Sequence, residues 1–147
     1  AADAAAWFDW LAAQPHVAGD RVGVTGYCRG GMLALLIAEE LGERVAAVGV
    51  FHAGGLSADE PDNPFRHVER VRGEALFRFA DADPGATPEA QAELAEALDA
   101  AGVRYSLATY PDAPHGYTMA DAPGRYQEAA AERHYKELRE LLGRALG

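Results

Sequence analysis

The sequence predicts an α/β fold in which a mostly parallel sheet of four strands is flanked by helices. Strand-like and helix-like segments alternate along the chain, which is the pattern that repeated β–α–β units produce. The segment 45–51 is apolar at successive positions, as expected of a strand buried on both faces of a parallel sheet. Helix boundaries are also marked, because Thr87 and Pro88 suit a helix start and Gly102 suits its end.

The elements can be placed in order from their local patterns. Four apolar side chains of the first helical segment recur at helical spacing, so we expect them to pack that helix against the sheet. They are Trp7, Phe8, Trp10 and Leu11. We expect helices at 1–14, 29–41, 88–101 and 126–146, strands at 21–26, 45–52, 74–80 and 103–110, and an irregular excursion at 54–71.

Composition and charge narrow the class of protein. A chain of 147 residues has the size of one domain, and its net charge of −10 argues against nucleic acids and anionic membranes as partners. The single cysteine excludes a disulfide framework within the chain, and no residue spacing suggests a metal site or a cofactor. We find neither a membrane-spanning run nor a signal pattern, and therefore expect a cytoplasmic protein.

The most informative segment is 26–31, where the only cysteine lies between glycines at a strand-to-helix junction. The spacing Gly-x-Cys-x-Gly is that of a nucleophile elbow, a tight turn in which a Cβ on either side is expected to clash. The helix N-terminus that follows Cys28 favours the thiolate form of its side chain. An inert, buried cysteine beside a tight turn is the alternative that this segment alone leaves open.

A thiol nucleophile also needs a histidine base and a carboxylate that orients the histidine. Asp81 and Asp83 follow the predicted strand 74–80, and His115 follows the predicted strand 103–110. These side chains therefore leave the carboxyl ends of strands, where open α/β sheets place their chemistry. On this reasoning either aspartate could be the partner of His115.

Three segments of the chain resemble the dienelactone hydrolase family of the α/β-hydrolase superfamily. They are 20–31, 80–89 and 110–117, and the tail 126–130 is similar to the start of that family's last helix. The resemblance covers nearly the whole chain, and it implies an α/β-hydrolase-like fold with a catalytic triad.

The resemblance also implies a role for each candidate residue. By similarity, Cys28 is the nucleophile, Asp83 the orienting acid and His115 the base. The backbone N–H of Arg29 is then one donor of the oxyanion hole. Asp83 is preferred to Asp81 because it keeps the family's distance to the proline–glutamate pair that follows.

Two features differ from the family's pattern. In the complete fold, several strands and the loop with the second oxyanion donor precede the elbow, so we interpret 1–147 as a single, partial domain. The edge of the strand 21–26 is then expected to be open, which favours self-association through it. The family's arginine four residues after the catalytic histidine, which holds a substrate carboxylate, is replaced here by Met119.

The function we predict is hydrolysis of a small-molecule ester or lactone through a Cys–Asp–His triad and an acyl-enzyme. Phe51 and His52 at the end of a strand, together with Tyr117 after the base, are expected to line the substrate pocket. The alternative is a non-catalytic fragment or scaffold that keeps the triad residues without a full oxyanion hole. A thiol redox protein is disfavoured by the aspartate and histidine at strand ends.

Overall fold

The computed structural model describes residues 2–56, 58, 59, 61 and 63–147, in which four parallel strands form one sheet of order β1-β2-β3-β4. The strands are β1 (Val22–Tyr27), β2 (Val45–Phe51), β3 (Glu74–Ala80) and β4 (Tyr105–Tyr110). The helices are α1 (Ala2–Ala12), α2 (Arg29–Glu40), α3 (Pro88–Ala101) and α4 (Glu128–Leu146), with short 3₁₀ helices η1 (Gly42–Arg44), η2 (Pro64–Arg66) and η3 (Val68–Arg70). The predicted α/β fold class is confirmed.

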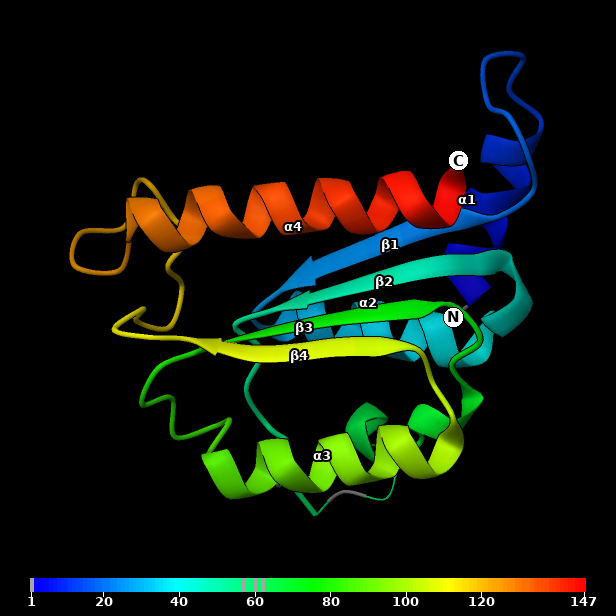
Figure 1. Ribbon diagram of the computed structural model, residues 1–147. Helices are drawn as coiled ribbons and strands as arrows, with labels where there is room; N and C mark the ends of the chain where they lie inside the picture. Colours follow the sequence, from blue (N-terminus) through cyan, green and yellow to red (C-terminus); the bar gives the residue numbers. More distant parts are fainter. Residues whose placement is uncertain (1, 57, 60, 62) are drawn as a thin grey trace.

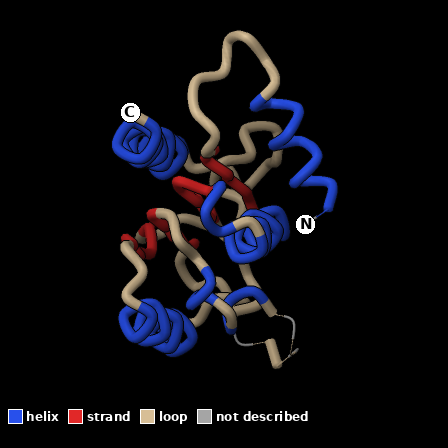
Figure 2. The backbone as a smooth tube through the Cα atoms, turned by 90° about the vertical axis from the view of Figure 1, so that its right-hand side faces the viewer, coloured by secondary structure: helices blue, strands red, loops and turns tan. Residues whose placement is uncertain are grey.

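Helices cover both faces of the sheet. In Figure 1, α4 lies above the strands, α3 lies below them and α2 is seen behind them, and Figure 2 shows α4 on one side of the strands with α2 and α3 on the other. The apolar residues of α2 explain its place, because Gly31, Ala34, Leu35 and Ala38 recur at helical spacing and are all buried. Burial of this stripe against β1 and β2 fixes the start of α2 at the carboxyl end of β1.

The central strands are more deeply buried than the outer ones. Every residue of β2 is buried, whereas residues of β1 alternate between half-buried and exposed until Gly26. Within the described part of the chain, β1 pairs with β2 only, so β1 is an edge strand. The central strand β2 is a continuous apolar run because neither of its faces meets water, whereas β3 is buried from Ala75 to Ala80 but includes Arg78.

The bounds of β3 and α3 match the predicted ones, and those of the other helices and strands differ by one or two residues. The strand β4 begins at Tyr105 rather than at 103 because the N–H of Val103 donates to Leu98 O at the end of α3. The strand β2 ends before His52, whose φ of +37° turns the chain away from the sheet. Residue 1, where the first helix was predicted to begin, lies outside the described residues.

The prediction for the first helix is wrong for its two tryptophans. Phe8 is buried, but Trp7 is 64% exposed and Trp10 is 55% exposed. The helix is instead held by Arg44, whose guanidinium lies 5.4 Å from the Phe8 ring centre and 2.8 Å from an Asp9 carboxylate oxygen. Helical spacing identified the helix, but one buried aromatic side chain is enough to attach it.

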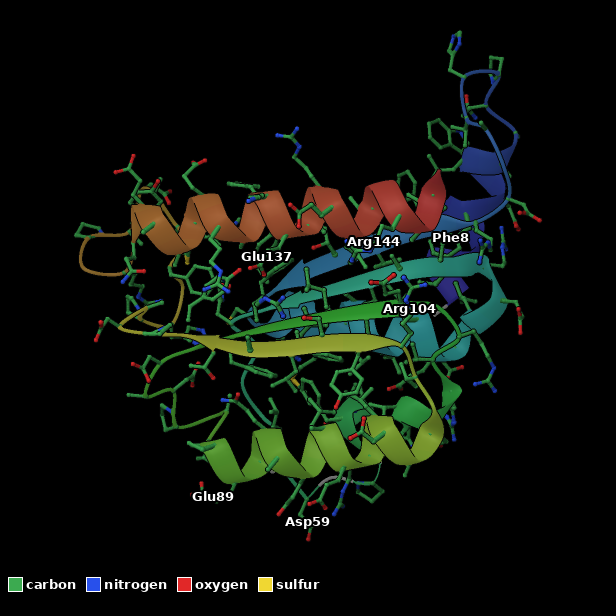
Figure 3. The ribbon with its side chains drawn as sticks, viewed as in Figure 1. Phe8, Asp59, Glu89, Arg104, Glu137 and Arg144 are labelled. Atoms are coloured by element: carbon green, nitrogen blue, oxygen red, sulfur yellow. The ribbon has the colours of Figure 1, made fainter. Side chains whose placement is uncertain are left out.

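A buried polar network joins α4 to the sheet. Arg78 in β3 is 6% exposed and pairs with Glu137, which lies between α4 and the sheet in Figure 3. The same carboxylate accepts hydrogen bonds from Tyr110 (3.0 Å) and Arg133 (2.7 Å). Burial alone would raise the pKa of Glu137, but hydrogen bonds from both arginines hold that pKa below its usual value. The network links α4 to Arg78 in β3 and to Tyr110 at the end of β4.

Candidate active site

Cys28 lies in a tight turn between β1 and α2. Its N–H donates to Phe51 O (2.9 Å), and its C=O accepts from the N–H of Gly31 (3.0 Å). Its backbone angles, φ +54° and ψ −126°, are rarely adopted by a residue with a side chain. The two hydrogen bonds hold the thiol, which is exposed, at the carboxyl end of the sheet. The structure thus has the predicted strand–turn–helix geometry of an elbow.

The glycines around Cys28 are not equally constrained. An added Cβ at Gly26 would lie 1.9 Å from Gly30 O, and one at Gly31 would lie 3.0 Å from the Cβ of Ala53. An added Cβ at Gly30 would meet nothing within 4 Å. The predicted steric restriction therefore holds before the cysteine, but after it the constraint falls on Gly31 rather than on Gly30.

The two candidate aspartates, which follow β3, have different partners. Asp81 accepts hydrogen bonds from the N–H groups of Ala82 and Asp112, both at 2.9 Å, and thereby joins two turns. Asp83 accepts from the N–H of Gly85 with one oxygen, and its other oxygen lies 2.6 Å from Nδ1 of His115. The structure therefore pairs Asp83, and not Asp81, with the histidine.

His115 connects the carboxylate and the thiol. Its Nε2 lies 3.1 Å from Sγ of Cys28, while its Nδ1 faces Asp83. With Nδ1–H donating to the carboxylate, Nε2 is left to take the thiol proton. The side chain of Asp83 is only 6% exposed and that of His115 is 36% exposed, so the carboxyl group is shielded from solvent while the imidazole remains accessible. Three loops that follow β1, β3 and β4 thus bring together a thiol, an imidazole and a carboxylate.

A groove of about 570 Å³ runs along α2, the helix that begins directly after Cys28. It is lined mainly by the outer face of α2, which contributes Arg29, Met32, Leu33 and Leu36, and by Asn63 and Pro64 across from it. Sequence reasoning named Arg29 as an oxyanion donor but missed the other lining residues. The signal was present, because α2 has apolar side chains on the face that does not contact the sheet.

The residues predicted to line the pocket do not do so. Phe51 and Tyr117 have no exposed surface, and His52 is 1% exposed. They belong to an aromatic cluster beneath the site, in which Tyr27 stacks on Phe51 with 5.2 Å between ring centres. Their place at strand ends was predicted correctly, but their side chains point into the protein because the 113–118 loop and α4 cover them.

A second buried imidazole belongs to the same cluster. His134 of α4 has no exposed surface, and its Nε2 lies 3.0 Å from the hydroxyl of Tyr27, the residue before Cys28. Its Nδ1 faces the carbonyl of Ala131, so the tyrosine hydroxyl is the donor toward Nε2. Burial lowers the pKa of His134, which keeps this ring neutral beneath the elbow.

Two further observations concern the described residues only. They contain no group of three or more histidine, cysteine, aspartate or glutamate side chains arranged to hold a metal ion. None of their helices has the length and apolar character needed to cross a membrane.

The parallel sheet between helices, with the elbow after β1 and the acid and base loops after β3 and β4, has the arrangement of the α/β-hydrolase fold. Within that fold, the sequence model of the dienelactone hydrolase family matches residues 1–146. The chain therefore belongs to the dienelactone hydrolase family.

Individual relatives agree with this assignment. The chain is 28% identical over 122 residues to a Salmonella typhi protein named "Putative carboxymethylenebutenolidase", a match that covers 82% of this chain and 45% of that protein. A crystal structure of a "Putative Dienelactone Hydrolase" from Klebsiella pneumoniae subsp. pneumoniae MGH 78578 shares the fold, with a TM-score of 0.83, 19% identity, and coverage of 96% of this chain and 59% of that one. A dienelactone hydrolase-like promiscuous phosphotriesterase from metagenomic libraries has a TM-score of 0.77 and 26% identity, over 97% of this chain and 59% of that one. The chain thus spans about half the length of these relatives.

Proposed function

We propose that this chain carries the triad of a dienelactone hydrolase-like cysteine hydrolase, which cleaves ester or lactone bonds through an acyl-enzyme. The observation that carries the proposal is the continuous contact from Sγ of Cys28 to Nε2 of His115 (3.1 Å) and from Nδ1 of His115 to Asp83 (2.6 Å). A nucleophile, a base and an orienting carboxylate in this order are the elements of nucleophilic acyl transfer.

In the first half of the proposed reaction, His115 Nε2 takes the proton of Cys28 and Sγ attacks the carbonyl carbon of the substrate. The carbonyl oxygen becomes an oxyanion, and Asp83 stabilises the imidazolium through Nδ1–H. The C–O bond of the ester then breaks, and Nε2–H gives its proton to the departing alkoxide. The product of this half is a thioester on Cys28.

In the second half, water attacks the thioester carbon while His115 accepts a proton from that water. The C–S bond breaks, the acid is released, and Sγ regains its proton or remains a thiolate. For a lactone, the alkoxide stays attached to the acyl group, so the final product is a hydroxy acid. A thiolate suits activated or enol esters, whose leaving groups depart easily.

The oxyanion is expected to be met by the backbone N–H of Arg29. Arg29 is the first residue of α2, so its N–H has no carbonyl partner one turn earlier in the helix. Hydrolases with this elbow use a second donor as well. Loss of one donor costs about 10²–10³ in turnover, so a chain that relies on Arg29 alone is expected to be slow.

The substrate class is proposed from the relatives and from the site. The Salmonella protein is named for carboxymethylenebutenolide, which is a lactone. In this chain Met119, which is 42% exposed, stands where the family has its substrate-binding arginine. A methionine cannot make the charge-assisted hydrogen bond of an arginine to a carboxylate. We therefore expect simple esters to be better substrates than acidic dienelactones.

The proposal is tested by comparing the parent chain with its Cys28→Ala and Cys28→Ser variants. Hydrolysis of p-nitrophenyl acetate and of a dienelactone is measured for each protein at equal concentration. We expect the alanine variant to lose about 10²-fold or more of the parent rate, because no other group replaces the thiolate. Circular dichroism provides the control for folding.

The alternative function is a non-catalytic scaffold, and the same experiment separates the two. Equal rates for the parent chain and Cys28→Ala would contradict the proposed hydrolase and support the scaffold. Cysteine-dependent hydrolysis of the simple ester alone would support an esterase without a carboxylate anchor.

A further inference from the structure

His52 is a buried imidazole to which the proposed mechanism gives no role. It follows β2 with a φ of +37°, and its backbone N–H donates a hydrogen bond to the backbone carbonyl of Arg78 at 2.7 Å. The residue is 1% exposed, and its Nδ1 has no hydrogen-bond partner among the described residues. A left-handed backbone at a non-glycine residue and an unpartnered buried nitrogen both cost free energy. Such costs concentrate at functional sites, which makes the contacts of this ring informative.

The ring of His52 contacts the loop that carries His115 at two places. Its Nε2 lies 2.9 Å from Oγ1 of Thr118, three residues after His115. Its ring centre lies 5.4 Å from that of His115, with an angle of 64° between the ring planes. The loop is closed by a hydrogen bond from the N–H of Tyr117 to Pro114 O (3.0 Å), so a contact at Thr118 also restrains His115.

The surroundings of His52 keep its ring neutral. Burial is the largest cause and the neighbouring His115 the second, and together they lower the pKa of His52 to about 4. His134 from α4 acts in the same direction, whereas the carboxylate of Asp83 opposes it. Tyr27 of β1 faces the ring at 5.8 Å and Tyr117 at 5.0 Å.

Neutrality matters for the proton that His115 carries. In the proposed reaction His115 becomes an imidazolium, and a second positive ring 5.4 Å away would disfavour that state. A neutral aromatic ring at this distance can instead interact favourably with the imidazolium through its π face or its edge.

We propose that His52 is a positioning residue for His115. Its ring contact with His115 and its hydrogen bond to Thr118 hold the 113–118 loop, so that Nε2 of His115 stays directed at Sγ of Cys28. The inference rests on the function proposed above. It predicts that changes at His52 alter the coupling between His115 and Cys28 more than they alter substrate binding.

The test measures that coupling through alkylation of Cys28 by iodoacetamide as a function of pH. The chain has one cysteine, so the rate reports the thiolate at this position. His52→Phe keeps a ring but loses the bond to Thr118, whereas His52→Gln keeps a hydrogen-bonding group and loses the ring. At pH 6 we expect His52→Phe to react about tenfold more slowly than the parent chain, with its acid limb moved to higher pH by about one unit. Glutamine should recover part of this loss.

Turnover gives a second, independent measurement. For an ester substrate, we expect His52→Phe to lower kcat by about tenfold while KM changes by less than about twofold. Thr118→Val should reproduce part of this loss of kcat. Thr118→Ser keeps the hydroxyl and should retain the kcat of the parent chain. The double variant of His52→Phe and Thr118→Val should lose little more than His52→Phe alone, because both remove the same hydrogen bond.

His134→Phe is the matched control. It removes another buried imidazole of the same cluster, but one whose hydrogen bonds go to Tyr27 and Ala131 rather than to Thr118. We expect it to lower Tm and to leave the acid limb of alkylation within about 0.3 pH unit of the parent chain.

A folded His52→Phe variant with the parent alkylation profile at every pH would overturn the inference. If His52→Phe does not fold, Thr118→Val decides, and an unchanged profile in that variant has the same meaning. Failure of the proposed function is detected by a different experiment, in which the Cys28→Ala variant hydrolyses the ester as fast as the parent chain. The alkylation profile still measures the role of His52 in that case, because it requires no turnover.

Discussion

The backbone conformation of the turn at Cys28 depends on the absence of a side chain at Gly26. At Gly26 the hydrogen in place of a side chain allows the carbonyl of Gly30 to approach, whereas at Gly30 the corresponding space is open. The turn therefore requires glycine at position 26 for steric reasons but not at position 30, although both positions are glycine in the sequence motif.

This difference predicts opposite effects of two alanine substitutions. Gly26→Ala is expected to lower the free energy of unfolding by about 3 kcal/mol or more, because its Cβ would lie 1.9 Å from a backbone oxygen. Gly30→Ala is the matched control, and we expect it to be neutral or to stabilise α2 by up to about 1 kcal/mol. Urea unfolding of both variants measures this, and equal destabilisation by the two would contradict the steric explanation.

Asp81 and Asp83 lie two residues apart, but only one of them touches the base. We expect Asp83→Asn to reduce the rate of ester hydrolysis by about 10²–10⁴-fold, because an amide can neither fix the histidine tautomer nor stabilise the imidazolium. Asp81→Asn serves as the control, since Asp81 accepts only backbone hydrogen bonds at a turn. It should lower Tm and leave the rate within about threefold. A loss of activity at Asp81 that equals the loss at Asp83 would reverse the assignment.

Among the elements, α2 combines several tasks along its length. Its N-terminus carries the candidate oxyanion donor, its inner stripe packs on the sheet, and its outer face lines the groove that includes Arg29. Near its C-terminal end, Glu39 is only 6% exposed, and its Oε1 has no hydrogen-bond partner among the described residues. Burial raises the pKa of Glu39 to about 8, and the nearby Arg70 only partly offsets this.

The buried carboxyl of Glu39 predicts a stability that falls as the pH rises. Between about pH 4.5 and pH 8 the folded state keeps a proton on Glu39 that the unfolded chain has released, so the free energy of unfolding decreases through this window. Glu39→Gln removes the titration. We expect it to be more stable than the parent chain by about 2–4 kcal/mol at pH 8 and nearly equal at pH 5.

Urea unfolding of the parent chain and Glu39→Gln at the two pH values measures this effect. Glu40→Gln, at the exposed neighbouring position, is the control. The difference in free energy of unfolding between this variant and the parent chain should be the same at pH 5 and pH 8. A Glu39→Gln variant whose stability difference is the same at pH 5 and pH 8 would show that the carboxyl is already ionised in the folded protein.

At the scale of the whole molecule, the strand β1 pairs with β2 along one edge and has no partner strand along its other edge within the described residues. An unpaired strand edge presents N–H and C=O groups that another strand can pair with, and proteins usually cover or charge such edges. The net charge of −10 opposes association over longer distances, and salt weakens that repulsion.

We therefore expect this chain to self-associate through β1, more strongly at high salt. Sedimentation equilibrium over a range of concentrations should show masses above that of one chain. Thr25→Lys adds a charge at an exposed position of β1 and should reduce the association. A single mass of one chain at every concentration and salt level would contradict this expectation.

The sequence by itself determined the order of the elements and the location of the elbow. Both depend on local properties: burial on both faces makes β2 a continuous apolar run, and the turn at Cys28 requires glycine within a few residues. The strands that precede Asp83 and His115 were recognised from their place in the alternation of strands and helices. Positions at the carboxyl ends of parallel strands then follow from the topology that alternating elements adopt.

Only the tertiary structure decided which side chains meet and which are covered. It buried Phe51, His52 and Tyr117 and left the tryptophans of α1 exposed. The residue pattern alone left Asp81 and Asp83 open as partners of His115; the family resemblance favoured Asp83, and the structure pairs that residue with the histidine. These outcomes depend on neighbours that are distant along the chain: Cys28 and His115 are 87 residues apart, and His52 and Thr118 are 66 apart. Local patterns specify backbone conformation, but the environment of a side chain is set by packing between segments, and a sequence pattern has no direct record of that packing.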